Sequence, residues 1–493
     1  MIKKICYTVF ALFLLLPSWS QAGSFGDGDP SGVPGQWYVG TTPSYVAPSK
    51  HPILFVHGLN SSSNTWWNDN NMYDTAYQNS YETAFIDLYP TKNMWDNGAL
   101  LSQKIRDIYN YFGEKVVVVA HSKGGIDTQS ALVHYGAYPY VARVITLSTP
   151  HYGSQLADLA YSSWAGWLTG ILGSKNDATY SLQTGYMSYF RSETDHHPNV
   201  NRNQIYTFGG TKWGSFGSSL YWGGLYLRTY GSNDGAVTVN SSRLPYGTEL
   251  RVGDWNHSTI KEGSSTFNLF KNYLNEVTNT SGFNTQSVVE SSVTENAASF
   301  VRGGEYRGKK QEKVLVEQGA KSATFDWISN SPSSQLILKD PGQQASSTFK
   351  VKKDESEYFN GAYHHTVTVQ DPAPGEWTLE ASSSSAEKYL LHVSFESAMN
   401  GALSIHLAQD EISLKAKDSK MKLQPDMTIE YYKDGKLKKS KVKTKNGSLK
   451  LPKLGKGVYN VTIDVEGSKD KTMFQRTFIK TIYVDASGKV FGQ

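Results

Sequence analysis

A run of valines leads directly into a short motif centred on one serine. Four valines at 116–119 are followed by the letters AHSKGG at 120–125, and Ser122 is the third of these. Small residues two positions before and after a serine allow a very tight turn between a buried strand and a helix, which leaves the serine oxygen exposed. Ala120 stands where glycine is usual, and alanine is still small enough. The motif predicts a strained nucleophilic serine; the alternative is an ordinary loop serine.

The surrounding sequence alternates apolar strand patterns with helical patterns from residue 51 to about 273. This alternation is typical of a mostly parallel sheet with helices on its faces. The expected strands are 52–56, 115–120, 141–147 and 204–208, and the expected helices are 98–112 and 124–135.

The composition changes after about residue 278. Ser, Thr and Asn dominate the next stretch, and short alternating strand patterns with regular turns follow it, as in immunoglobulin-like sandwiches. A hairpin is expected at 428–436, around Asp434 and Gly435. The last unit is rich in lysine, which fits either a solvated surface or attraction to anionic polymers or lipids. The predicted organisation is a signal peptide at 1–22, an N-terminal arm at 23–50, an α/β domain that contains Ser122 at 51–278, a linker at 279–300, a β-sandwich at 301–400 and a lysine-rich β domain at 401–493.

The first 22 residues read as a secretory signal. Two lysines precede a short apolar run, and small residues follow it up to Ala22. The run is too short to favour a membrane span. The only cysteine of the 493 residues is Cys6, inside this signal, so no disulfide is expected in the exported chain. We expect an exported protein that is secreted or lies outside the cytoplasm, and the net charge of +4 indicates no particular partner.

A serine nucleophile requires a histidine base and an acid that orients it. Asp234 precedes a glycine in a predicted turn and is the expected acid, and His257 near the end of the predicted fold is the expected base. Ser122, Asp234 and His257 then follow the chain order of an α/β-hydrolase. Alternative acids are Asp195 and Asp254, and alternative bases are His121, His151, His196 and His197.

The oxyanion of the reaction needs two backbone N–H donors. Lys123, the residue after the nucleophile, is the first expected donor. Leu59 is the second, because it follows an apolar strand and the pair His57-Gly58. His57 is expected to brace this loop rather than to take part in catalysis.

These motifs together resemble those of secreted bacterial true lipases. The resemblance rests on 57–59, 120–125, 148–154 and 233–237, and the stretch from Ser181 to Phe190 is similar to the Pseudomonas/Burkholderia branch. It implies an α/β-hydrolase fold and a lipase activity over residues 50–275. That branch carries a disulfide and a calcium site, but this chain has no cysteine after residue 6 and has Ser258-Thr259-Ile260 where the calcium aspartate is expected. No cofactor is therefore expected, and calcium at Asp27 and Asp29 is a weaker alternative.

Two apolar segments leave their roles open. Leucines and tryptophans at helical spacing in 156–172, interrupted by small residues, favour one or two short helices that form either a mobile lid or part of the core. The aromatic and glycine-rich stretch at 213–230 fits either a ligand pocket or packing around a β-hairpin.

Three functions remain to be weighed. The favoured one is a secreted serine carboxylic-ester hydrolase, specifically a triacylglycerol lipase that acts at a lipid–water interface through an acyl-enzyme. The second is an extracellular polyester depolymerase, for example of polyhydroxyalkanoate, with the β units as adhesion modules. The third is a surface-binding protein without catalysis. Nothing in the sequence indicates nucleic-acid binding or an oligomeric state.

Overall fold

The computed structural model describes residues 23–24, 32–276, 295–296, 298–346, 348–408, 411–433, 436–442, 448–451, 455–469 and 472–492. The predicted signal peptide at 1–22, the residues Asp27 and Asp29, and most of the predicted linker lie outside these residues, so those predictions stay untested. Among the described residues, none of the helices is both long and apolar enough to cross a membrane.

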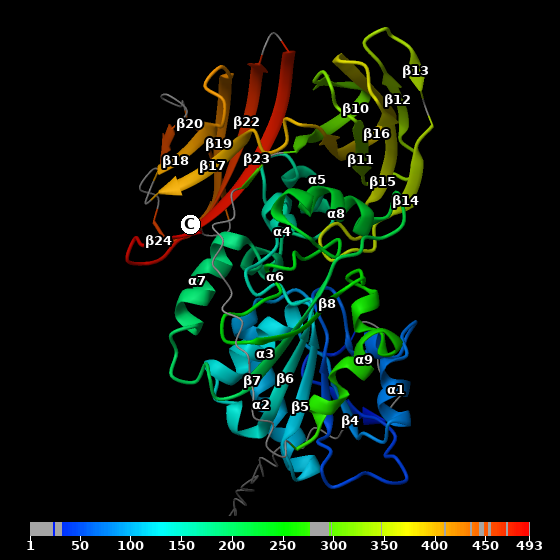
Figure 1. Cartoon of the computed structure of the whole chain (residues 1–493), viewed down its shortest axis with the longest axis vertical. Coiled ribbons are helices and arrows are strands. Elements are labelled where there is room, and N and C mark those ends of the chain that lie inside the picture. Colours follow the sequence, from blue (N-terminus) through cyan, green and yellow to red (C-terminus); the bar gives the residue numbers. More distant parts are fainter. Residues whose placement is uncertain are drawn as a thin grey trace, which may run out of the picture.

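An eight-stranded, mostly parallel sheet forms the lower half of the molecule in Figure 1, which confirms the predicted α/β class. Its strand order is β1-β2-β4-β3-β5-β6-β7-β8, and β2 runs antiparallel to β4. The strands are β1 (Gly23–Ser24), β2 (Trp37–Val39), β3 (Ile53–Val56), β4 (Thr83–Ile86), β5 (Val116–His121), β6 (Val141–Leu147), β7 (Gln204–Gly210) and β8 (Thr248–Gly253).

The valine run of β5 is buried because both faces of this sheet are covered. Val118 packs in a cluster with residues of α2 (Met94–Phe112) and α3 (Lys123–Val133). Val117 and Val119 point to the opposite face, where α9 (Gly263–Phe270) contributes to a second cluster. Side chains alternate along a strand, so a central strand between two helical layers is apolar at every position. Helix α1 (Met72–Gln78) also packs beside α9.

Five short helices, here called the cap, follow the strand ends. They are α4 (Gln155–Ala160), α5 (Gly166–Ile171), α6 (Asp177–Ser181), α7 (Thr184–Thr194) and α8 (Ser219–Leu227). The segment 156–172 thus forms two short helices, as its pattern allowed. The hairpin considered for 213–230 is wrong, because α8 occupies this stretch. The 3-10 turns are η1 (Ser63–Trp66), η2 (Tyr138–Tyr140), η3 (Arg228–Tyr230), η4 (Thr259–Lys261) and η5 (Lys271–Leu274).

The described residues from 295 onward, here called the C-terminal β region, form antiparallel sheets. One seven-stranded sheet contains a long strand, β16, that pairs with β10 along both of its halves, with β12 in its first half and with β11 in its second. Its strands are β10 (Ser299–Val316), β11 (Ser322–Ser329), β12 (Gln335–Lys339), β13 (Ala345–Ser346), β14 (Lys350–Lys353), β15 (Tyr363–Gln370) and β16 (Gly375–Glu396). The predicted linker is too long at its end, because β10 already begins at Ser299.

Two further sheets share one apolar core in the last part of the chain. Lys433 pairs with Lys436 across β19 and β20, which confirms the predicted hairpin. The four-stranded sheet contains β21 (Ser448–Lys450), β18 (Glu411–Ala416), β17 (Leu403–Ala408) and β9 (Glu295–Asn296). The five-stranded sheet contains β20 (Lys436–Val442), β19 (Lys422–Lys433), β22 (Gly457–Lys469), β23 (Thr472–Val484) and β24 (Val490–Phe491).

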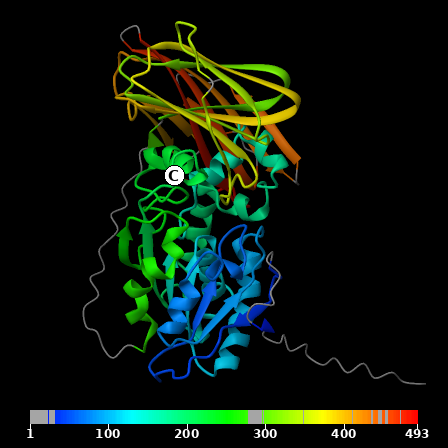
Figure 2. The ribbon, with the colours of Figure 1, turned by 90° about the vertical axis from the view of Figure 1, so that its right-hand side faces the viewer.

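The C-terminal β region lies on the cap, on the side of the parallel sheet where β5 ends (Figures 1 and 2). Thr481 of β23 donates a hydrogen bond to the carboxylate of Asp158 in α4 at 2.6 Å and accepts one from the amide of Gly185 in α7 at 3.0 Å. Tyr189 of α7 packs against Tyr483 with ring centroids 4.6 Å apart. These contacts hold the β region directly against the cap helices.

Gly185 lies where α7 and β23 approach each other closely enough to exclude a side chain. A Cβ at Gly185 would lie 2.7 Å from the backbone of Ile482, whereas a Cβ at Gly170 in α5 meets nothing within 4 Å. Gly185→Ala is expected to weaken the attachment of the C-terminal β region by about 1–3 kcal/mol, because overpacking forces the backbone apart. Gly170→Ala should leave it unchanged or slightly more stable, since alanine favours a helix. Thermal unfolding together with limited proteolysis measures both; equal behaviour of the two variants would contradict the close contact.

Candidate active site

Ser122 lies at the sharp turn between β5 and α3. Its backbone adopts φ 51° and ψ −133°, a left-handed conformation that is strained for a residue with a side chain. A Cβ at Gly124 would lie 2.4 Å from the carbonyl oxygen of His57, so glycine is required there for the helix to start this close to β3. The local sequence thus holds Ser122 in the strained turn that the motif predicted.

Asp234 and His257 meet beside this serine. The Nδ1 of His257 donates to Oδ2 of Asp234 at 2.7 Å, and both side chains are buried. The other carboxylate oxygen accepts the amides of Ala236 and Val237 at 2.9 and 2.7 Å. Two backbone amides and one imidazole therefore fix the carboxylate in place, and the carboxylate fixes the ring orientation and tautomer of His257.

The alternative acids lie elsewhere. Asp254 is exposed and lies 3.5 Å from Lys212, and Asp195 accepts a hydrogen bond from Tyr246 at 2.8 Å. Neither contacts His257, so the structure brings together the predicted acid and base.

The alternative bases also have other surroundings. His121 uses its Nε2 to donate to the carbonyl oxygen of His257 at 2.8 Å, and burial lowers its pKa well below the usual range. Burial likewise lowers the pKa of His151. His196 lies at the end of α7, where its Nδ1 faces the carbonyl of Ser192 at 3.3 Å. His197 stacks near His134, with ring centroids 5.1 Å apart.

The loop after β3 lies directly beside the nucleophile. A Cβ at Gly58 would lie 2.8 Å from the Cβ of Ser122, so this loop, which carries Leu59, approaches as closely as glycine allows. The amide of Leu88 donates to Nε2 of His57 at 2.9 Å, and Nδ1 of His57 donates to the carbonyl of Gly58 at 2.8 Å. Burial lowers the pKa of His57 to about 4, so this ring is neutral and braces the loop.

Lys123, the other predicted oxyanion residue, is held by a buried polar network. Its Nζ donates to both oxygens of Asp127 at 2.7 and 2.9 Å, and Asn97 donates to the same carboxylate at 3.0 Å. The side chain of Asn97 also bonds the amide and the carbonyl of Tyr89. Leu88 and Tyr89 are neighbours in sequence, so one short segment after β4 supports both predicted oxyanion residues.

A third acidic residue, Glu357, occupies the site and was not predicted. It lies in the loop between β14 and β15 of the C-terminal β region, 235 positions from Ser122 in the chain. The hydroxyl of Ser122 donates to Oε2 of Glu357 at 3.1 Å, and Nε2 of His257 lies 3.4 Å from Oε1. The side-chain amide of Asn60 donates to the carbonyl of Glu357 at 2.7 Å. No local motif marks this glutamate, because only tertiary packing brings its loop to the serine.

His257 is charged in this arrangement. Burial alone would lower its pKa, but the carboxylates of Asp234 and Glu357 outweigh burial and raise the pKa of His257 to about 10. An imidazolium already carries a proton on both nitrogens. It cannot accept the proton of Ser122, so the site as described has the triad residues in place but lacks a free base.

The turn after His257 is where the resembled lipase branch carries its calcium aspartate. Ser258, Thr259 and Ile260 follow His257, and the side chain of Ile260 is fully buried, so this turn does not offer the carboxylates that calcium requires. Among the described residues, His121, His257 and Glu357 are the one group of potential metal ligands within 4.8 Å of one another. Asp234, Ser122 and the His257 carbonyl already engage these side chains.

Comparison with known proteins decides the family. The crystal structure of the Bacillus licheniformis lipase BlEst2 in propeptide form superposes with a TM-score of 0.84 and 42% identity, and it covers 94% of this chain and 100% of that one. The chain belongs to the lipase/esterase family of α/β-hydrolases. Members of this family are carboxylic-ester hydrolases, so the predicted enzyme class is confirmed, while the Pseudomonas/Burkholderia branch stays a prediction.

Two other matches cover less. The same Bacillus lipase in mature form is 57% identical and covers 50% of this chain and 100% of its own, with a TM-score of 0.48. Triacylglycerol lipase 2 of Saccharomyces cerevisiae is 32% identical over 134 residues, which is 26% of this chain. This chain spans 40% of the length of that yeast relative. No protein-family model matches the chain.

The form described here, with Glu357 bonded to Ser122 and His257, is called the closed form. The charged pair of His257 and Glu357 makes the stability of this form sensitive to alkaline pH. The pKa of His257 is raised from 6.5 to about 10, so its stabilising contribution is complete below about 6.5 and is lost as the pH rises through about 10. We expect Glu357→Gln to lower the stability of the closed form by about 1–3 kcal/mol near neutral pH. The difference between wild type and variant should shrink as the pH approaches 10.

Thermal unfolding midpoints of both proteins across this range measure the effect. His364, whose pKa the carboxylates of Asp326 and Asp354 raise to about 10 against the effect of burial, is present in both proteins and cancels in the comparison. A difference that stays constant with pH would show that Glu357 is not paired with a protonated His257.

Proposed function

We propose that this protein is a secreted serine carboxylic-ester hydrolase, specifically a triacylglycerol lipase. The observation that carries the proposal is the buried Asp234–His257 pair beside a serine in a strained strand–helix turn. In the proposed reaction, neutral His257 removes the proton of Ser122, and the serine oxygen attacks the ester carbonyl. The amides of Leu59 and Lys123 stabilise the oxyanion, and Asp234 stabilises the imidazolium that forms.

The second half of the proposed reaction releases the acid. His257 gives its proton to the departing alcohol, and the acyl group stays on Ser122 as an ester. His257 then removes a proton from water, which attacks the acyl-enzyme, and the fatty acid leaves as Ser122 regains its proton. Neither half requires a metal ion in this proposal, and no cofactor is assigned.

The proposed substrates are water-insoluble esters at a lipid–water interface. The solved Bacillus relative and the yeast relative are both lipases by name, which supports acylglycerols. The cap offers supporting geometry: Leu156, Leu159 and Leu168 of α4 and α5 lie in one apolar cluster with Leu59. Such helices would expose an apolar surface to lipid when uncovered. Export through the signal at 1–22 is part of the same proposal.

An ester series tests the proposed activity. Short, medium and long acyl esters are offered with and without emulsification to Glu357→Ala, which lacks the carboxylate that bonds Ser122 and His257, and to the same variant with Ser122→Ala added, and the released acid is titrated. We expect a rise in the rate of Glu357→Ala above the solubility limit and a loss of at least about 10⁴-fold when Ser122→Ala is added. Clearing of polyester films without acylglycerol hydrolysis would favour the depolymerase instead. Ester hydrolysis that survives Ser122→Ala would contradict the assigned nucleophile.

We further propose that the C-terminal β region keeps the enzyme inactive until it is displaced. The Bacillus relative that matches 94% of this chain is described as being in propeptide form. Glu357 from this region bonds Ser122 and His257, occupying the place that a substrate carbonyl would need. Because the same carboxylate favours the protonated form of His257, it hinders both the access of substrate to Ser122 and the transfer of the Ser122 proton to His257.

Glu357→Ala should therefore raise the hydrolysis of soluble short-chain esters by the full chain, by roughly tenfold or more, since a group bonded to both catalytic side chains is removed. Glu355→Ala is the matched control, because Glu355 lies two residues away in the same loop and is exposed. Initial rates at one substrate concentration measure both variants. Equal rates in both would show that Glu357 does not restrain the enzyme.

A further inference from the structure

The loop at 354–362 presents Glu357 on a rigid base. The amide of Asp354 donates to the carbonyl of Ala362 at 2.8 Å, and the amide of Gly361 donates back to the carbonyl of Asp354 at 2.9 Å. The side chain of Asp354 accepts from Nε2 of His364 at 2.8 Å, while Nδ1 of His364 bonds Asp326 of β11 at 2.9 Å. All three of these charged side chains are buried. The loop is thus fixed at its base and enters the site in one defined conformation.

The Glu357 carboxylate lies where a carboxylic acid product must lie. When water hydrolyses the acyl-enzyme, the carboxyl group of the product is left between the serine oxygen, Nε2 of the histidine and the oxyanion donors. Glu357 places one oxygen on Ser122 and the other on His257. A Cβ at Gly58 would lie 3.2 Å from Oε1, so the carboxylate also borders the loop that carries Leu59.

The two residues after Glu357 are buried aromatic side chains. Tyr358 is 1% exposed and Phe359 is 0% exposed. Phe359 packs edge-on against Trp222 of α8, with ring centroids 5.0 Å apart. Both aromatic residues belong to one apolar cluster with Leu59 and with the cap leucines, so this cluster reaches the loop that lies beside Ser122.

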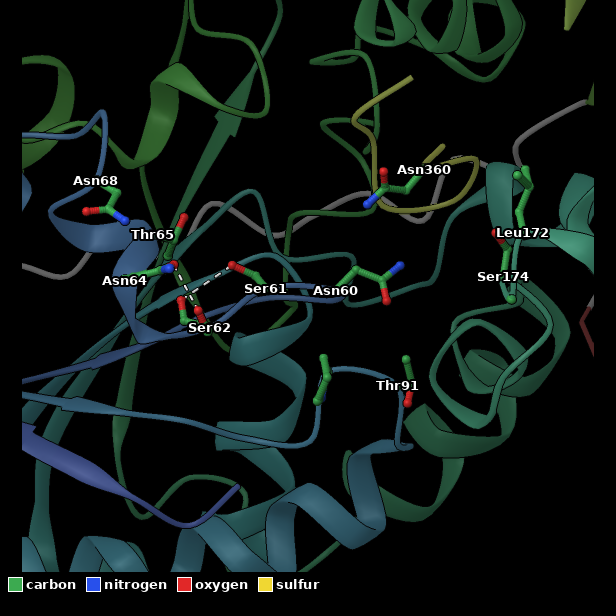
Figure 3. A pocket seen from close by; sticks show the side chains of 12 residues that line it. Asn60, Ser61, Ser62, Asn64, Thr65, Asn68, Thr91, Leu172, Ser174 and Asn360 are labelled. Carbon is green, nitrogen blue, oxygen red and sulfur yellow. Dashed lines mark hydrogen bonds between the residues drawn. The ribbon is translucent and has the colours of Figure 1, made fainter. Parts of the chain in front are cut away.

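The next residue of the loop faces a different environment. Asn360 lines a groove of about 700 Å³ whose walls are mostly amide and hydroxyl side chains, shown in Figure 3. The other polar lining residues are Asn60, Ser61, Ser62, Asn64, Thr65, Asn68, Thr91 and Ser174. Successive side chains of the loop therefore lie in different surroundings. Glu357 bonds the catalytic pair, Tyr358 and Phe359 belong to the apolar cluster, and Asn360 lines the polar groove.

We propose that Glu357, Tyr358 and Phe359 bind as a tethered analogue of the carboxylic acid product, and that the pocket of the two rings is the acyl-binding pocket of the uncovered enzyme. The inference rests on the proposed ester hydrolysis by Ser122. It assigns the acyl side of the substrate to the space between Leu59, the leucines of α4 and Trp222. It also predicts that aliphatic carboxylates are the class of ligand that this site binds after the loop has left.

Two phosphonate probes separate product mimicry from simple coverage of the site. Each probe is a p-nitrophenyl alkylphosphonate, one with a methyl chain and one with a decyl chain. Once Glu357 has left and His257 is neutral, Ser122 Oγ attacks phosphorus and loses its proton to His257, the bond from phosphorus to the nitrophenyl oxygen breaks, and nitrophenolate leaves. The rate of nitrophenolate release from the full chain is measured for each variant, and mass spectrometry of peptides identifies the labelled residue.

The variants are expected to differ in a probe-dependent way. Glu357→Ala should accelerate both probes, by roughly tenfold or more, because the carboxylate blocks the reacting atoms for either one. Tyr358→Ala and Phe359→Ala should raise the ratio of decyl to methyl rates by roughly tenfold, because the emptied space binds the decyl chain and helps only that probe to displace Glu357. Asn360→Ala is the matched control and should leave the ratio unchanged.

Each other result counts against a specific claim. If Tyr358→Ala and Phe359→Ala accelerate both probes equally, the loop only covers the entrance and the inference is overturned. Tyr358→Phe and Phe359→Leu keep most of the volume and guard against misfolding; they should return the ratio toward wild type. If no variant is labelled at Ser122, the proposed function fails, and the inference fails with it.

Discussion

A buried row of charged side chains lies beside Ser122 and keeps His257 protonated. His257 lies between the carboxylates of Asp234 and Glu357, and a buried imidazolium is tolerable only because both are present. Desolvation lowers the pKa of the Lys261 ammonium, and its attraction to the Glu357 carboxylate opposes this effect, so Lys261 adds a further positive charge near Glu357. In the proposed activation, removal of Glu357 would leave Asp234 as the carboxylate partner of His257.

Burial of apolar side chains links the cap to the C-terminal β region. The cap helices have apolar faces, and Leu168 shares a cluster with Val301, Ile328 and Ile479 from the β sheets. The helices of the segment 156–172 are packed under the β region in this structure, and the lid role belongs to the proposed state in which that region is displaced. An enzyme with this surface would be adhesive in the absence of lipid, and the β region covers it.

The errors of the sequence analysis have identifiable causes. The aromatic and glycine-rich stretch 213–230 left a pocket and packing around a hairpin equally open, yet Gly223 and Gly224 lie inside α8. A Cβ at Gly223 would lie 2.0 Å from the carbonyl oxygen of Gly235, so glycine is needed there for the helix to approach the turn that holds Asp234. A glycine required for a close approach and a glycine required for a turn look the same in a single sequence. Strand pairing also crosses the predicted domain boundaries. Strand β9 precedes β10 in the chain but pairs with β17 in another sheet.

The sequence by itself determined the sheet class, the strained serine turn and the chain order of Ser122, Asp234 and His257. These follow from local rules: side-chain alternation, the small residues of a tight turn, and the spacing of strands and loops. Only the tertiary structure decided that Glu357 lies on the serine and that Tyr358 and Phe359 fill the apolar space beside it. The contact between Glu357 and Ser122 joins residues 235 positions apart. Their energy comes from burying charges and rings against partners that no local pattern specifies.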